Sequence, residues 1–239
     1  MLKIKKLTSR SSSKGIIDNI DLVCPTGKIH AIIGNKDAGK STLLDIIGSR
    51  TCADSGVVYI DGETIKSLGE QYRSFVGFLF LSEAICCRLT SDEYLDMLGA
   101  MYGVSDRIRK AKVEYLVESL NLPNEGYVDS FSYDDQKKLK LAATLVHSPR
   151  YLVLYEPLDG VSTATKRVMS DVLRDLAMNG TTILYTTSHI DCLDEVADLV
   201  SIIDAGKIIY KSYYMELKKI IAKDCIQDTS SLVHTFNGI

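Results

Sequence analysis

The sequence lacks an excess of charge of either sign, and it lacks long apolar runs. Its 239 residues hold 28 lysines and arginines against 31 aspartates and glutamates, a net charge of −3, which excludes a protein that binds nucleic acid through charge alone. No segment reaches the roughly 18 consecutive apolar residues of a membrane-spanning helix. The first six residues lack the apolar stretch of a secretory signal. We therefore expect a cytosolic globular protein.

Cysteine pairs with the spacing of a metal or redox site are also missing. Six cysteines occur singly or side by side, at positions 24, 52, 86, 87, 192 and 225. None forms a C-x-x-C pattern. We therefore expect free thiols in a reducing compartment, and we expect the adjacent Cys86 and Cys87 to be buried thiols and not a disulfide.

The order of β-rich and helical segments indicates an α/β fold. We expect strands at 2–7, 16–23, 28–33, 57–60, 73–81, 151–155, 181–186, 199–203 and 207–210. Apolar residues at helical spacing predict helices over 40–49, 92–102, 106–120, 134–147, 163–178 and 213–223, with Ser91 as the N-cap of the second. Because strands alternate with helices in the last third, the sheet is expected to be mostly parallel, with helices packed on it.

A glycine-containing loop between a predicted strand and a predicted helix has the clearest chemical pattern. Residues 34–41 satisfy G-x-x-x-x-G-K-[ST]. In such a loop backbone N–H groups surround a phosphate, the lysine reaches the β and γ phosphates, and the hydroxyl can ligate Mg²⁺. The alternative is a relic loop that binds only an inorganic anion. The residues expected to bind nucleotide are Gly34, Asn35, Lys36, Asp37, Ala38, Gly39, Lys40, Ser41 and Thr42, with Ser41 at the metal.

The motifs, in order along the chain, resemble those of the nucleotide-binding subunits of ABC transporters. The resemblance covers essentially the whole chain. It includes Glu156-Pro157 after a buried strand, and the ending 231–236 is similar to that of ABC-2-type exporter ATPases. It implies one P-loop NTPase domain with an N-terminal antiparallel β region. The implied parts are a RecA-like core (1–84 and 149–212), an inserted helical subdomain (85–148), and a C-terminal helix and tail (213–239).

The resemblance also implies a function and its partners. The chain would be a cytoplasmic subunit on the cytoplasmic face of a membrane, binding ATP and Mg²⁺ and acting with a separate permease and a second ATP-binding subunit, identical or different. Glu156 would be the general base and His189 the switch histidine. Counting back from Asp198, however, places Ser188 at the switch position, so both residues stay open. Ser132 would contact the γ-phosphate held by the opposite subunit.

Several positions depart from the family pattern in ways that remove chemistry. Asp37 stands where the family has glycine, and its carboxylate ~6 Å from a phosphate costs about 3 kcal/mol. The aromatic residue that stacks on adenine has no counterpart in residues 8–13. Leu81 replaces the Q-loop glutamine, and Tyr155 replaces the Walker B aspartate that anchors Mg²⁺ through water. We therefore expect nucleotide binding that depends only weakly on Mg²⁺.

The signature motif departs most. The family's L-S-G-G-Q corresponds to Phe131-Ser132-Tyr133-Asp134-Asp135. Tyr133 occupies the place of a glycine needed for close approach, and the two carboxylates are expected to face an anion. Hydrolysis is therefore expected to be weak or absent. Two alternatives stay open, namely a fully competent transport ATPase and a regulatory module that kept the fold without turnover.

Overall fold

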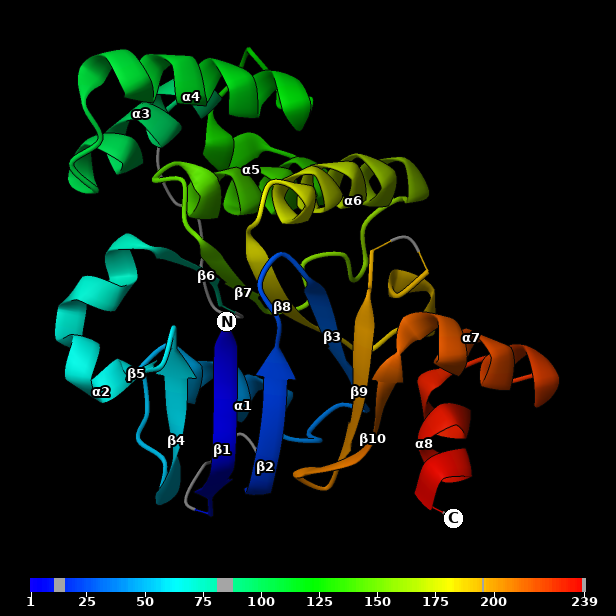
Figure 1. The fold of residues 1–239 in the computed structure, drawn as a ribbon. Coiled ribbons are helices and arrows are strands. Elements are labelled where there is room, and N and C mark those ends of the chain that lie inside the picture. Colours follow the sequence, from blue (N-terminus) through cyan, green and yellow to red (C-terminus); the bar gives the residue numbers. More distant parts are fainter. Residues whose placement is uncertain (11–15, 81–87, 195, 238–239) are drawn as a thin grey trace.

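The computed structural model describes residues 1–10, 16–80, 88–194 and 196–237, and it contains two sheets (Figure 1). The first has four strands in the order β2-β1-β4-β5 and is antiparallel. The second has six strands in the order β10-β9-β3-β8-β7-β6, with β10 antiparallel to β9 and the other pairs parallel. The strands are β1 (Leu2–Ser9), β2 (Ile17–Cys24), β3 (Ile29–Ile33), β4 (Ser55–Ile60), β5 (Glu63–Thr64), β6 (Val76–Leu79), β7 (Tyr151–Leu154), β8 (Thr182–Thr187), β9 (Leu199–Asp204) and β10 (Lys207–Tyr213).

Helices cover these sheets and extend beyond them. In Figure 1, α3 and α4 lie together at one end of the molecule, α5 and α6 lie side by side between them and the strands, α1 lies between the two sheets, and α7 and α8 flank β9 and β10. The helices are α1 (Lys40–Ile47), α2 (Ile65–Leu68), α3 (Ser91–Met101), α4 (Asp106–Ser119), α5 (Tyr133–Leu145), α6 (Thr163–Met178), α7 (Tyr214–Lys223) and α8 (Thr229–Asn237). No helix among the described residues is both long and apolar enough to cross a bilayer.

Strands β3, β7 and β8 form the buried centre of the six-stranded sheet. Every residue of these three strands is buried, as parallel strands covered on both faces require. Strand β1 alternates instead: Leu2, Ile4 and Leu7 are buried against the layer containing α1, while the lysines between them face outward. The expected mostly parallel sheet and the antiparallel N-terminal region are both present.

Three expectations about local structure need correction. Thr90, not Ser91, is the N-cap of α3, because its hydroxyl accepts from the Glu93 N–H while the Glu93 carboxylate accepts from the Thr90 N–H, a reciprocal capping box. The strand expected at 73–81 is β6, which is shorter, because residues Gly69–Ser74 form a 3₁₀ turn. Helix α8 was not expected. The predicted boundary between core and helical subdomain, Leu81, Cys86 and Cys87 lie outside the described residues.

The cysteines that the structure describes, Cys24, Cys52, Cys192 and Cys225, are free thiols, as expected. Burial raises the pKa of Cys24 and of Cys192 to about 12. Both therefore stay protonated at neutral pH, and a protonated thiol is a poor nucleophile. Within the described residues no group of three His, Cys, Asp or Glu side chains is placed to hold a metal ion.

A buried histidine in β3 makes the fold sensitive to acid. His30 is 4% exposed, its Nδ1 lies 3.1 Å from the Val23 carbonyl oxygen, and its Nε2 lies 2.9 Å from Ser201 Oγ. Both contacts are satisfied by a neutral ring that donates from Nδ1 and accepts from the serine hydroxyl. Burial lowers the pKa of His30 from 6.5 to about 4. The ring is therefore neutral in the folded chain throughout the range in which the unfolded chain takes up a proton.

The first prediction follows from this depressed pKa. The unfolded state binds the extra proton between pH 6.5 and about 4, so the free energy of unfolding should fall as the pH falls through that window. By pH 4, proton uptake by His30 in the unfolded state lowers the free energy of unfolding by about 3 kcal/mol. Urea unfolding of His30→Gln at pH 7 and pH 4 should show a shallower loss than the wild type. His234→Gln, at an exposed histidine, is the control, and an equal loss in all three proteins would contradict the prediction.

Candidate functional site

The loop between β3 and α1 is built around close backbone contacts. At Gly34 an added Cβ would come within 2.3 Å of the Ile203 carbonyl oxygen, so a larger residue does not fit. Gly39 has φ 103°, a left-handed conformation that favours glycine, and it lies directly before α1. The Gly206 N–H donates to the Ala38 carbonyl and so ties the loop to the β9–β10 turn. The loop is therefore held in one shape at the N-terminus of α1, where backbone N–H groups favour anions.

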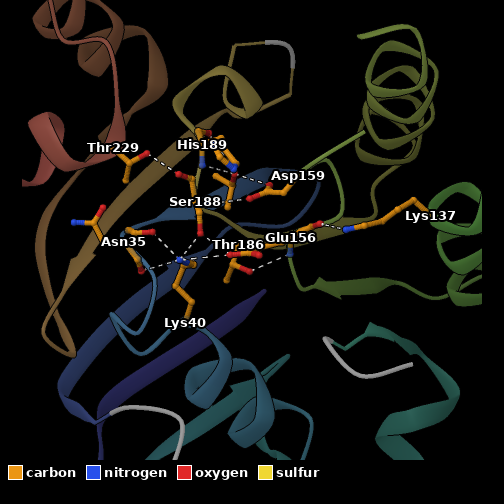
Figure 2. Close-up of polar contacts among 11 residues, drawn as sticks. Asn35, Lys40, Lys137, Glu156, Asp159, Thr186, Ser188, His189 and Thr229 are labelled. Carbon is orange, nitrogen blue, oxygen red and sulfur yellow. Dashed lines mark hydrogen bonds and ion pairs between the residues drawn. The ribbon is translucent and has the colours of Figure 1, made fainter. Parts of the chain in front are cut away.

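Lys40 lies at the centre of the site (Figure 2). Its ammonium donates to the carbonyl oxygens of Gly34 at 2.6 Å and Asn35 at 2.9 Å, and to Ser188 Oγ at 2.8 Å. It also lies 3.5 Å from Glu156 Oε1, and its side chain is only 4% exposed. Burial lowers the pKa of Lys40, while the Glu156 carboxylate opposes that shift. The ammonium is thus a buried cation, fully hydrogen-bonded within the chain.

Glu156 joins the end of β7 to this lysine. Ser188 Oγ donates to Glu156 Oε1 at 2.7 Å, so one hydroxyl bridges the carboxylate and the ammonium. Glu156 has φ 42°, an unfavourable conformation for a residue with a side chain. Two contacts hold it there: its N–H donates to Thr186 Oγ1 at 3.2 Å, and Lys137 donates to its carbonyl oxygen at 2.6 Å.

Behind Ser188 lies a buried carboxylate, Asp159. Asp159 is 7% exposed and accepts from Thr187 Oγ1 at 2.7 Å and from the Ser188 N–H at 2.8 Å. Burial raises its pKa, and these two hydrogen bonds oppose the shift. Asp159 therefore fixes the backbone that presents the Ser188 hydroxyl. In the sequence, the feature that points to Asp159 is its position three residues after Glu156.

The structure brings Ser188 into the site and places His189 at its border. The His189 side chain is exposed, and its backbone N–H and carbonyl oxygen contact Thr187 Oγ1 at 3.0 and 3.2 Å. The Ser188 hydroxyl, in contrast, touches both Lys40 and Glu156. Of the two candidates left open by the sequence, Ser188 is the one whose side chain reaches the lysine and the carboxylate.

Two of the residues that depart from the family pattern lie around the loop. Asp37 is exposed and has φ 65°, a conformation that glycine adopts without strain. Tyr155 is half-buried and packs against the core cluster that includes Val153. Burial raises the pKa of Tyr155 to about 12. Its phenol is therefore neutral at pH 7 and is a weak ligand for Mg²⁺, which prefers carboxylates and water.

The signature-like segment forms the first turn of α5. Ser132 is the N-cap: its Oγ accepts from the Asp135 N–H at 3.2 Å and donates to Asp135 Oδ2 at 2.6 Å. Asp135 also pairs with Lys138 at 2.8 Å. Asp134 accepts from the N–H and hydroxyl of Ser162, the N-cap of α6. Each carboxylate is thus bound to groups of its own chain, and the expectation that both face an anion of an opposite subunit stays a prediction.

Tyr133 is the exposed member of this segment. Its side chain is 57% exposed, its hydroxyl lies 3.4 Å from the Asp159 carbonyl oxygen, and the Lys137 ammonium lies 5.7 Å from its ring centre. A phenol ring therefore covers the surface where the family has a glycine. It also keeps this turn in contact with the loop before α6.

The second prediction concerns the Asp135–Lys138 pair. Lys138 is 8% exposed, and Asp135→Asn would remove its charge partner, so the free energy of unfolding should fall by about 1–3 kcal/mol. Nucleotide affinity should not rise, because this carboxylate is already neutralised within the chain. Asp171→Asn removes a carboxylate with the same spacing to Arg174 from an exposed pair and should change stability by less than ~0.5 kcal/mol. Urea unfolding of both variants measures the difference, and equal effects would refute the prediction.

The first residues of α8 also reach the site. Thr229 Oγ1 donates to the Ser188 carbonyl oxygen at 2.8 Å, and Ser230 Oγ donates to Asn35 Oδ1 at 3.1 Å. From the sequence, residues 213–239 were expected to form a C-terminal helix and tail. The contacts join segments about 40 and 195 residues apart.

Comparison with known proteins settles the family. The sequence model of the ABC transporter family matches residues 17–159, more than half of the chain. The chain belongs to the ABC transporter family. Among solved structures, the ATP-binding subunit of an ABC transporter superposes with a TM-score of 0.84 at 20% identity, covering 99% of both chains. A dimeric bacterial ABC transporter cassette gives 0.78 at 21% identity, covering 89% of this chain and 98% of the other. These likenesses confirm the predicted P-loop fold.

Two curated members of the ABC family illustrate the range of similar sequences. The daunorubicin resistance ATP-binding protein DrrA3 of Streptomyces coeruleorubidus is 29% identical over 211 residues, 87% of this chain and 67% of its own length. The methionine import ATP-binding protein MetN 1 of Rhodococcus jostii (strain RHA1) is 29% identical over 228 residues, 91% of this chain and 68% of its own. This ABC family member thus spans about two thirds of these relatives.

Proposed function

We propose that this chain is an ATP-binding subunit of an ABC transporter that holds the nucleotide phosphates at residues 34–42. The observation that carries the proposal is the buried ammonium of Lys40, enclosed by the rigid loop and 3.5 Å from Glu156. A phosphate oxygen could take the place of one of its hydrogen-bond acceptors, with backbone N–H groups and the N-terminus of α1 adding attraction. The tight fit at Gly34 and the left-handed Gly39 are what such a cradle needs.

The side chains around the loop at 34–42 suit the binding of ATP better than the binding of Mg²⁺. Ser41 would be the protein's metal ligand in this proposal, and Tyr155 supplies a neutral phenol where a carboxylate would anchor the metal's water. Asp37 adds negative charge at the mouth of the loop. We therefore propose weak nucleotide binding with little dependence on Mg²⁺.

Hydrolysis is proposed to be weak or absent. Glu156 is the proposed general base, with Ser188 in the switch position. His189 stays a prediction as a catalytic group, since it would have to act from the border of the site. In a head-to-tail pair Tyr133 would stand where the opposite nucleotide needs a small residue and backbone N–H groups, and Ser132 would have to release its capping bonds to reach that phosphate. The proposed obstruction is therefore steric, through the ring of Tyr133.

The partners and the location follow from the same proposal. The printed names of the curated relatives describe resistance and import ATP-binding proteins, and one neighbouring structure is a dimer. We propose that this chain pairs with a second ATP-binding subunit and docks on a membrane permease at the cytoplasmic face. The core at 1–84 and 149–212 would hold the nucleotide, the helices within 85–148 would meet the partners, and nucleic acid has no part in the proposal.

Two measurements test the proposal. Calorimetric titration with ATP, with and without Mg²⁺, should give weak binding that Mg²⁺ changes little. Steady-state ATPase assays of the protein, alone and reconstituted with a membrane permease that it binds, should show little turnover. Tight binding with strong Mg²⁺ dependence and rapid hydrolysis would instead establish a competent transport ATPase. The absence of any ATP binding would leave the regulatory alternative.

A further inference from the structure

Helix α8 is fixed along its whole length against the six-stranded sheet and its edge. Leu232 and Val233 are buried, at 0% and 5% exposed. The ring of Phe236 packs on that of Tyr210 with centres 4.1 Å apart, and Asn237 Nδ2 donates to Asp204 Oδ2 at 2.8 Å. Its first turn is therefore held in place when it meets the phosphate loop.

The two anchors of that first turn coincide with groups that hold Lys40. Thr229, itself 6% exposed, bonds the carbonyl of Ser188, whose hydroxyl accepts from the ammonium. Ser230 Oγ donates to the side-chain oxygen of Asn35, and the main-chain carbonyl of the same residue accepts from the ammonium. Figure 2 shows Ser188 lying between Thr229 and Lys40. Helix α8 is thus hydrogen-bonded to two of the three residues that accept from the Lys40 ammonium, Ser188 and Asn35.

An ammonium has three hydrogens to donate, and those of Lys40 are used by Gly34, Asn35 and Ser188. A phosphate oxygen that reaches Nζ must displace one of these acceptors. Two of them are main-chain carbonyls of the rigid loop. The third is the hydroxyl of Ser188, on the short segment after β8. Nucleotide binding therefore requires Ser188 to withdraw, and the bond from Thr229 opposes that movement.

We propose that Thr229 and Ser230 are positioning residues that hold Ser188 and Asn35 in the nucleotide-free arrangement, so that helix α8 opposes nucleotide binding and is loosened by it. The inference rests on the proposed binding of ATP at Lys40. Because linkage between two events is reciprocal, weakening the α8 anchors must tighten nucleotide binding to the degree that the nucleotide loosens α8.

Three substitutions in α8 test the first half of this linkage by titration with ATP. Thr229→Val removes the hydroxyl while keeping the shape of the buried side chain, and affinity should rise at least about fivefold. Thr229→Ser keeps the hydroxyl and should behave as the wild type. Thr235→Val removes a hydroxyl that bonds Ser231 within the helix and should also leave affinity unchanged. Equal or weaker affinity in Thr229→Val, or the same gain in Thr235→Val, overturns the inference.

Hydrogen exchange of the amides of residues 229–233 tests the second half. Exchange should be faster when ATP is bound. It should also be faster without nucleotide in Lys40→Met, which removes the ammonium that holds Ser188 and Asn35. If wild type binds no ATP but Lys40→Met still speeds exchange, the proposed function fails and the coupling stands. If neither ATP nor Lys40→Met changes exchange in α8, the inference is wrong, whatever the affinity for ATP.

Discussion

Lys40→Met is expected to weaken ATP binding by up to about a hundredfold. Methionine keeps the buried stem of the side chain but removes the ammonium that we propose to reach the phosphates. A charge-assisted hydrogen bond to phosphate is worth up to about 3 kcal/mol, and that energy corresponds to roughly a hundredfold in affinity. Calorimetric titration with ATP, at low ionic strength to bring weak binding into range, gives the measurement.

The matched control for Lys40→Met is Lys36→Ala. Lys36 belongs to the same loop and carries the same charge, but its side chain is exposed. Its removal should change affinity by less than about threefold, since an exposed charge is screened by solvent and salt. If the two variants lose affinity equally, ATP binding depends on the overall positive charge of the loop and not on the specific site around the Lys40 ammonium.

Tyr155→Asp is expected to make ATP binding depend on Mg²⁺. At the end of β7 the variant would place a carboxylate where the wild type has a phenol whose pKa burial raises to about 12. A carboxylate holds a metal-bound water, and a neutral phenol does so poorly. Mg²⁺ should therefore raise ATP affinity at least about tenfold in the variant and less than about threefold in the wild type. The binding free energies that correspond to these two limits differ by roughly 1 kcal/mol or less. Titrations with and without Mg²⁺ measure both ratios.

Tyr155→Asn separates the charge from the loss of packing. Both variants give up contacts with the core cluster, so both should lose about 1–2 kcal/mol of unfolding free energy. Only the aspartate variant should gain Mg²⁺ dependence. Turnover should stay low in both, because Tyr133 still covers the signature position and groups that act together are not restored one at a time. Robust hydrolysis by Tyr155→Asp alone would contradict this account of Tyr133.

The parts of the site that follow from local spacing could be predicted from the sequence. The pattern at 34–41 predicted the strand, loop and helix that place Lys40, because glycine positions and the flanking apolar runs determine that geometry over a few residues. The role of Glu156 came from the resemblance to ABC transporter subunits, which places a general base directly after a buried strand. The cap of α3 was within reach too, since Thr90 precedes Glu93 by the three residues of a capping box.

The remaining features depend on contacts between distant segments, which spacing does not reveal. From the sequence alone, the carboxylates of Asp134 and Asp135 are expected to repel a phosphate. Only the fold shows that Ser162 binds the first and Lys138 the second. Ser188 and His189 are neighbours, and the direction of β8 decides which side chain enters the site. Helix α8 is short and its role depends on where its first turn lands, beside a loop some 195 residues earlier in the chain.

The bond from Lys137 to the carbonyl of Glu156 has a mechanical consequence. Lys137 belongs to α5, which packs against β6 and α6 as well as against α3 and α4, whereas Glu156 lies just after a core strand in a left-handed conformation that needs support. A movement of α5 away from β7 would therefore stretch or break the 2.6 Å bond that supports the Glu156 backbone. Lys137 therefore ties α5 to the residue whose carboxylate lies beside Lys40.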